Sequence, residues 1–292
     1  LMAEWFWIDG DENGYVPADD RGLAFADGVF ETLRIEHGRV CLANYHQERL
    51  ALGLACLLFP NAAKTAAQAL EAVSRWGLSH QGLGDGASLR LTVTRGSGPR
   101  GYAPNVNTQP RVLARLTTGL PANAPPAKMG VADISWPEQP ALSGHKLLTR
   151  TEQVLAAHQV AVSGHDDLIM TNLNGAVVSA TAGNVFFRRE GALFTPHLSA
   201  HGIAGTRRRY LIDELASRHG FTVHQGTVEQ QSLDDFDEAF ICNSLIGIRS
   251  IASIQLANRT IAFTSFGAAE TLRQGIHGLE YNHGRHLSTE QS

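Results

Sequence analysis

Alternation of hydrophobic and polar positions predicts short strands in the first third of the chain. Three segments alternate in this way: EWFWIDG from residue 4, VFETLRIEHGRVCL from residue 29, with a turn at residues 37–39, and ASLRLTVTR from residue 87. A period of two is typical of strands with one buried face. Between them, leucines recur at helical spacing after Asn44, and a second helical pattern runs from about Thr65 to a stop at Gly77. Residues 1–120 are therefore expected to form a small α+β domain.

The segment PANAPPAK at residues 121–128 interrupts these patterns. It carries three prolines and no apolar periodicity, which is typical of an extended linker. We expect the domain boundary at this linker, with a larger domain over residues 129–292.

Strand patterns dominate the larger domain. MGVADISW predicts a strand, and two hairpins are predicted, one turning at Asn174 and Gly175 and the other at Glu190 and Gly191. Helices are predicted from residue 147 to 163 and from Thr206 to Gly220. Further strands are expected in DEAFICNSLIGIRSIASIQL, residues 237–256.

Composition narrows the possible partners. The 292 residues are 43% hydrophobic and 18% charged, which supports a sizeable core and excludes a mainly disordered chain. A net charge of -4 gives no field that would attract nucleic acid or an anionic membrane, and no apolar run approaches the roughly 20 residues that span a bilayer. The three cysteines are far apart in apolar segments, so we expect buried thiols rather than disulfides. We therefore expect a cytoplasmic protein that acts on a small molecule.

Two familiar motifs do not predict a binding site, because their neighbouring residues do not fit. GSGPRG at residues 96–101 matches a dinucleotide fingerprint, but the following residues, YAPN, do not open a helix. A loop that presents Arg95 or Arg100 to a substrate carboxylate and a plain surface loop remain the alternatives. His197 and His201 lie four residues apart, but a proline and a glycine bracket them, so no metal site is expected.

Lysine is rare in this chain, which directs attention to Lys146. Of 24 basic residues only three are lysines, and Lys64 and Lys128 lie in segments typical of the surface. Lys146 is followed by two leucines where a helix is expected to begin, and desolvation there would lower its pKa and make it a nucleophile. The alternative is a lysine at a helix start that faces water. A Schiff-base lysine would require pyridoxal phosphate, a phosphate cup and a partner for the ring nitrogen.

Seven ordered motifs carry a resemblance to a known family. They are DRGLAFADGVFETLR at 20–34, HQERL at 46–50, TRGSGPRGY at 94–102, KLLTRTEQVLA at 146–156, VVSATAGNVFF at 177–187, GIAGTRRR at 202–209 and ICNSLIG at 241–247. The chain resembles the fold-type IV, class IV aminotransferase-like enzymes that use pyridoxal 5'-phosphate. Within this family it is most similar to the lyases of folate biosynthesis that act on 4-amino-4-deoxychorismate.

The resemblance implies an architecture and an assembly. The fold would be α+β, with a small N-terminal α+β domain and a larger C-terminal domain built around a β-barrel-like core. The cofactor would lie between the two domains. The enzyme would be a homodimer in which the partner contributes residues to each site.

The resemblance also implies the roles of individual residues. Lys146 would be the catalytic residue and hold the cofactor as a Schiff base, while Phe30 and Arg100 would face the substrate. The phosphate would be bound by the side chain of Arg49, the backbone of Thr206 and Arg207, Ser244 and the amide of Leu245.

Two positions depart from the wider family. Ser179 stands where many members have a carboxylate under the pyridine nitrogen, and a neutral hydroxyl makes the ring a weaker electron sink. Arg150 stands in place of a tyrosine near the cofactor phenolate, where its fixed charge favours the deprotonated oxygen. Because a transaminase must stabilise a carbanion for longer than a lyase, the loss of the carboxylate favours a lyase.

The resemblance thus implies conversion of 4-amino-4-deoxychorismate to 4-aminobenzoate and pyruvate, with Lys146 as the base. A D-amino-acid or branched-chain aminotransferase on the same scaffold is one alternative. A non-catalytic homologue that binds pyridoxal phosphate is the other.

Overall fold

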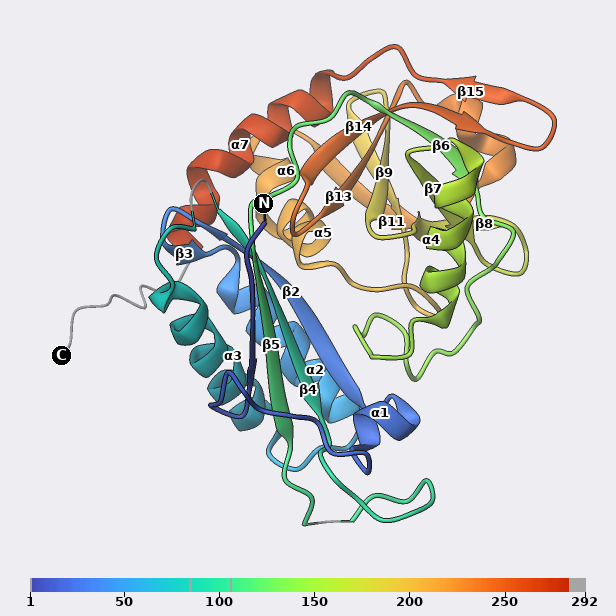
Figure 1. The fold of residues 1–292 in the computed structure, drawn as a ribbon. Helices are drawn as coiled ribbons and strands as arrows, with labels where there is room; N and C mark the ends of the chain where they lie inside the picture. Colours follow the sequence, from blue (N-terminus) through green and yellow to red (C-terminus); the bar gives the residue numbers. More distant parts are fainter. Residues whose placement is uncertain (1, 84–85, 106, 284–292) are drawn as a thin grey trace. The chain divides into compact units, whose positions relative to one another are not determined.

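The chain forms two compact units in the computed structural model, which describes residues 2–83, 86–105 and 107–283 (Figure 1). Of the described residues, unit 1 comprises 2–83, 86–105, 107–121, 145–149 and 280–283, and unit 2 comprises Ala122–Gly144 and Arg150–Leu279. Three details differ from the expected organisation. Ala127 and Lys128 already belong to a strand of unit 2 rather than to a linker, and a short segment that contains Lys146 belongs to unit 1. The described residues 280–283 also belong to unit 1 rather than to the larger domain.

Unit 1 is built on an antiparallel sheet with the strand order β1-β5-β4-β2-β3. Its strands are β1 (Glu4–Ile8), β2 (Gly28–Glu36), β3 (Arg39–Val40), β4 (Ala87–Thr94) and β5 (Arg111–Thr118). Its helices are α1 (Arg21–Phe25), α2 (Ala43–Cys56) and α3 (Ala62–Ser79). The three predicted alternating segments are confirmed as strands. The loops of this unit connect the strands of this sheet.

Helices α2 and α3 pack on one face of this sheet and form its core (Figure 1). Leu54 of α2 and Val73 of α3 are fully buried in the same cluster as Leu89 of β4. Helix α3 runs past the predicted stop at Gly77. A Cβ at Gly77 would lie 2.9 Å from Leu89, so this glycine allows close packing of helix on strand instead of ending the helix.

Unit 2 contains the second sheet, in the strand order β11-β10-β9-β13-β14-β6-β7-β8-β12, with β15 paired to β14. Its strands are β6 (Ala127–Val131), β7 (Asp167–Thr171), β8 (Ala176–Ala180), β9 (Asn184–Arg189), β10 (Ala192–Pro196), β11 (Thr222–Gly226), β12 (Val228–Glu229), β13 (Glu238–Asn243), β14 (Gly247–Gln255) and β15 (Thr260–Ala262). Its helices are α4 (Thr151–Ser163), α5 (Thr206–Tyr210), a π-helical turn (Leu211–Leu215), α6 (Ala216–Arg218), a 3₁₀ helix (Gln230–Asp235) and α7 (Gly267–His283).

The sheet of unit 2 curls around one buried cluster, and a second, smaller cluster includes Trp136 and Ala156 of α4. Met129 of β6, Ile169 of β7, Val177 of β8, Phe187 of β9 and Ile254 of β14 belong to one buried cluster. Strands that lie several places apart in the sheet therefore face one another across the same interior. This arrangement confirms the expected α+β fold with a β-barrel-like core.

Both predicted hairpins of unit 2 are confirmed. Strands β7 and β8 are antiparallel, and the side chain of Asn172 accepts hydrogen bonds from the amides of Asn174 and Ala176 in the turn. Strands β9 and β10 are joined by Glu190 and Gly191, with φ of 50° and 83°. Two successive positive φ values are what a tight two-residue hairpin turn requires.

Among the helices of the described residues, none combines the length and hydrophobicity that crossing a lipid bilayer requires.

Candidate functional site

The residues singled out in the sequence fall on both units. Unit 1 carries Lys146, Phe30, Arg49 and Arg100, and unit 2 carries the remaining residues, which are Arg150, Ser179, Thr206, Arg207, Ser244 and Leu245.

Lys146 lies on an extended segment that runs along β2. Phe30 donates its amide to the carbonyl of Lys146 at 3.0 Å, and the amide of Leu148 donates to the carbonyl of Gly28 at 3.0 Å. The expected helix start directly after Lys146 is wrong, because α4 begins at Thr151. Leu147 explains the difference, since it is buried in the core of unit 1 and bridges to β2, which holds the segment extended.

The side chain of Lys146 is half-buried beside an aromatic ring. Its Nζ lies 4.3 Å from the centre of the Phe30 ring, and Phe30 itself is buried. This distance lies within the range at which a cation and the face of an aromatic ring attract one another. The structure thus brings together two of the predicted site residues, the lysine and the phenylalanine.

Arg49 on α2 is held by a carboxylate that the sequence analysis missed. Its Nε donates to Oε1 of Glu31 at 2.8 Å, its Nη2 donates to Oε2, and His46 contacts the same carboxylate through Nδ1 at 2.6 Å. Burial alone would raise the pKa of Glu31, but the charges and hydrogen bonds of Arg49 and His46 outweigh it and lower the pKa to about 2. Glu31 therefore fixes the guanidinium of Arg49 in one orientation.

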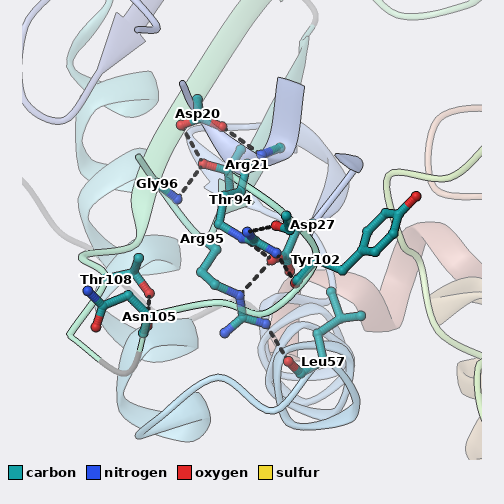
Figure 2. Close-up of polar contacts among 12 residues, drawn as sticks. Asp20, Arg21, Asp27, Leu57, Thr94, Arg95, Gly96, Tyr102, Asn105 and Thr108 are labelled. Carbon is teal, nitrogen blue, oxygen red and sulfur yellow. Dashed lines mark hydrogen bonds and ion pairs between the residues drawn. The ribbon is translucent and has the colours of Figure 1, made fainter. Parts of the chain in front are cut away.

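Arg95 and Arg100 differ in exposure, although both lie at the Gly-rich loop. Arg95 is buried and donates to Asp27 at 2.7 Å and to the carbonyl of Leu57 at 2.5 Å (Figure 2). The alternative that Arg95 is presented to a substrate is wrong, because its guanidinium is engaged in this internal network. Arg100 lies on the exposed part of the loop.

Two hydroxyl groups meet at the start of a helix in unit 2. Oγ1 of Thr206, the first residue of α5, lies 3.2 Å from Oγ of Ser244, which follows β13. The preceding residue is Gly205, where a Cβ would come within 2.1 Å of Oδ1 of Asn184. Only glycine lets the chain pass this close to Asn184, so the start of α5 lies against the first residue of β9.

Leu245 and Arg207 are also placed near this helix start. The amide of Leu245 donates to Oδ1 of Asn243 at 2.9 Å within the turn after β13. The side chain of Arg207 is fully buried close to Cys242, whose pKa is raised to about 12 by burial, although the arginine charge acts to lower it. Arg207 therefore contributes positive charge close to Cys242, two positions before Ser244.

Ser179 has a partner that the sequence analysis missed. Nε1 of Trp136 donates to Oγ of Ser179 at 2.9 Å, and both residues are buried. The guanidinium of Arg150 lies 5.4 Å from the centre of the Trp136 ring, and burial lowers the pKa of Arg150. The indole hydrogen bond occupies an acceptor position of the serine hydroxyl and leaves its O–H as a donor.

Unit 1 by itself carries groups that suit a reactive carbonyl and a phosphate, and unit 2 by itself carries groups that suit a phosphate. Paired hydroxyls at a helix start and an oriented guanidinium are groups that bind phosphate, and a half-buried lysine amine is a nucleophile for a carbonyl. The residues present therefore fit pyridoxal phosphate, the cofactor that a Schiff-base lysine would require.

Comparisons with known proteins agree with these features. Residues 28–254 match the family model described as amino-transferase class IV. An aminodeoxychorismate lyase of Vibrio harveyi is 30% identical over 263 residues, covering 88% of this chain and 94% of that protein.

Solved structures are similar along almost the whole chain. The crystal structure of a 4-amino-4-deoxychorismate lyase from Pseudomonas aeruginosa has a TM-score of 0.80 and 31% sequence identity, covering 94% of this chain and 99% of that one. The branched-chain amino acid aminotransferase of Escherichia coli has a TM-score of 0.82 at 20% identity, with 94% of both chains covered, and this likeness shows the fold alone.

Proposed function

This chain belongs to the amino-transferase class IV family, and from that membership we propose that it is a lyase that converts 4-amino-4-deoxychorismate to 4-aminobenzoate and pyruvate. It is an enzyme of the fold-type IV class, with pyridoxal phosphate as its cofactor. The relatives named aminodeoxychorismate lyase, one of them 30% identical over 88% of the chain, support this reaction.

The observation that carries the proposal is the hydrogen bond from Trp136 to Ser179. A serine hydroxyl that already accepts the indole N–H is a neutral group, and it cannot supply the negative charge that a carboxylate would. When bound, the cofactor withdraws electrons from the bond next to the substrate nitrogen. Without a carboxylate at this position the site favours a reaction that releases those electrons at once, by expelling a leaving group, over one that stores them.

Lys146 is the residue that we assign to proton transfer. Its Nζ would hold the cofactor through the aldehyde group, and as a free amine it would remove the hydrogen on the ring carbon that bears the substrate amine. The Phe30 ring at 4.3 Å stabilises the ammonium ion that results. The amine can then return this proton to the departing enolpyruvyl group, which leaves as pyruvate while the substrate ring becomes aromatic.

The remaining predicted residues are assigned to binding. We assign the cofactor phosphate to Arg49, oriented by Glu31, and to the hydroxyls of Thr206 and Ser244. The backbone of Arg207 and the amide of Leu245 complete this group, and Arg150 is assigned to the cofactor oxygen. Arg100 and Phe30 are assigned to the substrate, whose carboxylates suit a guanidinium.

Product identification tests this function. The purified enzyme, saturated with pyridoxal phosphate, is mixed with freshly prepared aminodeoxychorismate, and both products are quantified by chromatography. We expect 4-aminobenzoate and pyruvate in equal amounts, and we expect the rate to fall when the cofactor has been removed by dialysis against a carbonyl reagent.

Substitution of the lysine sharpens this test. Lys146→Ala is expected to abolish turnover together with the visible absorbance of the bound cofactor, because both depend on the same amine. Lys64→Ala, which removes an exposed lysine of the same unit, is the matched control and should retain both. Normal turnover in Lys146→Ala would refute the assignment of this residue.

Other outcomes identify the alternatives. Transfer of an amino group from an amino donor to an added keto acid, without release of 4-aminobenzoate, would establish an aminotransferase. Retention of the cofactor absorbance without reaction of any substrate or amino donor would establish a non-catalytic homologue.

The assembly and location of the enzyme are also proposals. The family resemblance supports a homodimer, and the charge and cysteine content support a cytoplasmic location. Sedimentation equilibrium of the holoenzyme is expected to give twice the chain mass of 31.5 kDa, and a monomer would contradict the assembly.

A further inference from the structure

We propose that Arg21 is a positioning residue that holds the loop of residues 96–102 and, through this loop, places Arg100 for the substrate. The inference rests on the proposed function, which assigns Arg100 to a substrate carboxylate. Neither the function nor the family resemblance assigns a role to Arg21.

The Arg21 side chain is bound to the backbone of the loop (Figure 2). Its Nη1 donates to the carbonyl of Gly101 at 3.0 Å and its Nη2 donates to the carbonyl of Tyr102 at 2.6 Å. These two residues directly follow Arg100. Only 3% of Arg21 is exposed, so both hydrogen bonds are shielded from water, whereas Arg100 and Tyr102 are exposed.

Arg21 is itself held in place by an ion pair and by a backbone hydrogen bond. Its Nε donates to Oδ2 of Asp27 at 2.9 Å, and Arg95 donates to the same oxygen at 2.7 Å (Figure 2). The backbone amide of Arg21 donates to the carbonyl of Gly96 at 2.9 Å, at the beginning of the loop. The loop is thus tied to Arg21 both at its beginning and just beyond Arg100.

The start of α1 is fixed by a second carboxylate. Asp20 is fully buried, and it accepts hydrogen bonds from the amide of Gly22 at 2.8 Å and from Oγ1 of Thr94 at 3.0 Å, and a further one from Arg111. Asp20 therefore joins α1 to strands β4 and β5, and Arg21, the next residue, extends from a rigid base.

Gly98 shows that the loop and the Arg21 stem are in close contact. A Cβ at Gly98 would lie 2.6 Å from Cδ of Arg21 and 3.0 Å from Cγ. Because the guanidinium is held by three acceptors, the stem has little freedom to move aside. The backbone at Gly98 has no positive φ, so the close approach to Arg21, and not backbone strain, is what requires glycine.

The contacts of Arg21 suit a loop that presents the charge of Arg100 to a substrate carboxylate. A long arginine on a flexible loop loses conformational freedom when it binds, and a loop that is ordered beforehand loses less. The planar fork of an arginine can bind two adjacent carbonyls and a carboxylate at once, which the single ammonium of a lysine cannot do with the same geometry. Arg21 thus acts on the substrate only through the position of Arg100.

Limited proteolysis of the holoenzyme measures the hold on the loop directly. Trypsin cleaves after arginine, and the bond between Arg100 and Gly101 lies on the exposed part of the loop. In Arg21→Gln we expect cleavage at this bond, identified by mass spectrometry, to be about tenfold faster or more, since loss of charge-assisted hydrogen bonds of this strength corresponds to at least such a factor. Arg34→Gln, which removes an ion-paired arginine from β2 of the same unit, is the matched control and should leave this cleavage rate unchanged.

Steady-state kinetics of the lyase reaction measure the consequence for the substrate. Arg21→Gln is expected to raise KM about tenfold with kcat within about twofold of the wild type, because a displaced Arg100 weakens binding and leaves Lys146 in place. In the Arg100→Ala background the same substitution should raise KM no further, because the residue through which it acts is gone.

Gly98→Ala provides a second perturbation without loss of charge. Its methyl group should push the loop away from Arg21, with faster cleavage after Arg100 and a raised KM, even if Arg21→Gln fails to fold.

The outcomes separate this inference from the proposed function. Unchanged cleavage after Arg100 in both Arg21→Gln and Gly98→Ala would overturn the inference, and so would an equal rise in KM in the Arg100→Ala background. A wild-type KM in Arg100→Ala alone would instead remove Arg100 from the proposed function, while the proteolysis would still decide whether Arg21 holds the loop.

Discussion

The two units position their site residues by different kinds of interaction. In unit 1 the side chains are held by buried ion pairs, namely Arg49 with Glu31 and Arg21 and Arg95 with Asp27. In unit 2 the corresponding contacts are hydrogen bonds of neutral groups, from Trp136 to Ser179 and between the hydroxyls of two further residues, Thr206 and Ser244.

The difference between ion pairs and neutral hydrogen bonds has consequences for stability. A buried ion pair is costly to break by removing one partner, because the other charge remains buried and uncompensated. A neutral hydrogen bond contributes less, and its loss leaves only a polar group without a partner. Substitutions of the ion-paired carboxylates of unit 1 should therefore disturb stability and its pH dependence strongly, and substitutions of the hydrogen-bonded hydroxyls of unit 2 only moderately.

The largest effect is expected at Glu31. Glu31→Gln removes the charge that compensates Arg49 and His46, and it should lower the free energy of unfolding by about 3–5 kcal/mol. Urea denaturation followed by circular dichroism measures this change. The control is Glu71→Gln, which breaks an exposed i,i+4 pair with Arg75 and should change the stability by less than about 0.5 kcal/mol. Equal effects of the two substitutions would contradict the comparison between units.

In the wild type, the contribution of Glu31 to stability should be lost at low pH. The pKa of Glu31 is about 2 in the folded chain against 4.5 for an unperturbed glutamate, so its contribution is fully present above pH 4.5 and is lost as the pH falls toward 2. A shift of this size corresponds to about 3 kcal/mol.

Unfolding free energies measured across this range should therefore fall more steeply for the wild type than for Glu31→Gln. Parallel pH profiles of the two proteins would show that Glu31 is not stabilised by its partners.

A smaller effect is expected at Ser179. Ser179→Ala leaves the buried indole N–H of Trp136 without its acceptor, which should cost about 1–3 kcal/mol. Ser179→Thr keeps the hydroxyl and is the matched control. Thermal unfolding of the two variants measures the difference, and a loss of stability as large as that of Glu31→Gln would remove the distinction between units.

Local patterns predicted the elements of the fold because they depend on nearby residues. Alternation gave the strands of unit 1, and the turn residues around Gly175 and Gly191 gave the two hairpins of unit 2. Prediction failed where tertiary packing decides. Gly77 lies inside a helix because it packs closely on Leu89, and the segment at Lys146 is extended because Leu147 enters the core.

The partners of the site residues were harder to predict than the residues themselves. Glu31 lies 18 positions from Arg49, and Trp136 lies 43 positions from Ser179, so no local pattern connects them. Glu31 belongs to a motif that carried the family resemblance, but its charge facing an arginine on a neighbouring helix becomes evident only in the fold. Arg21 was part of the same motif, and its role depends on contacts 80 and 81 positions away.

The number of turnovers in the absence of an amino acceptor tests the central claim most directly. The holoenzyme is mixed with a large excess of aminodeoxychorismate and no keto acid, and pyruvate released per subunit is measured over time. The proposed lyase should release many equivalents of pyruvate per subunit at a steady rate, because each cycle returns Lys146 and the cofactor to their starting state. Release of no more than one equivalent of pyruvate per subunit in the absence of a keto acid would contradict the account.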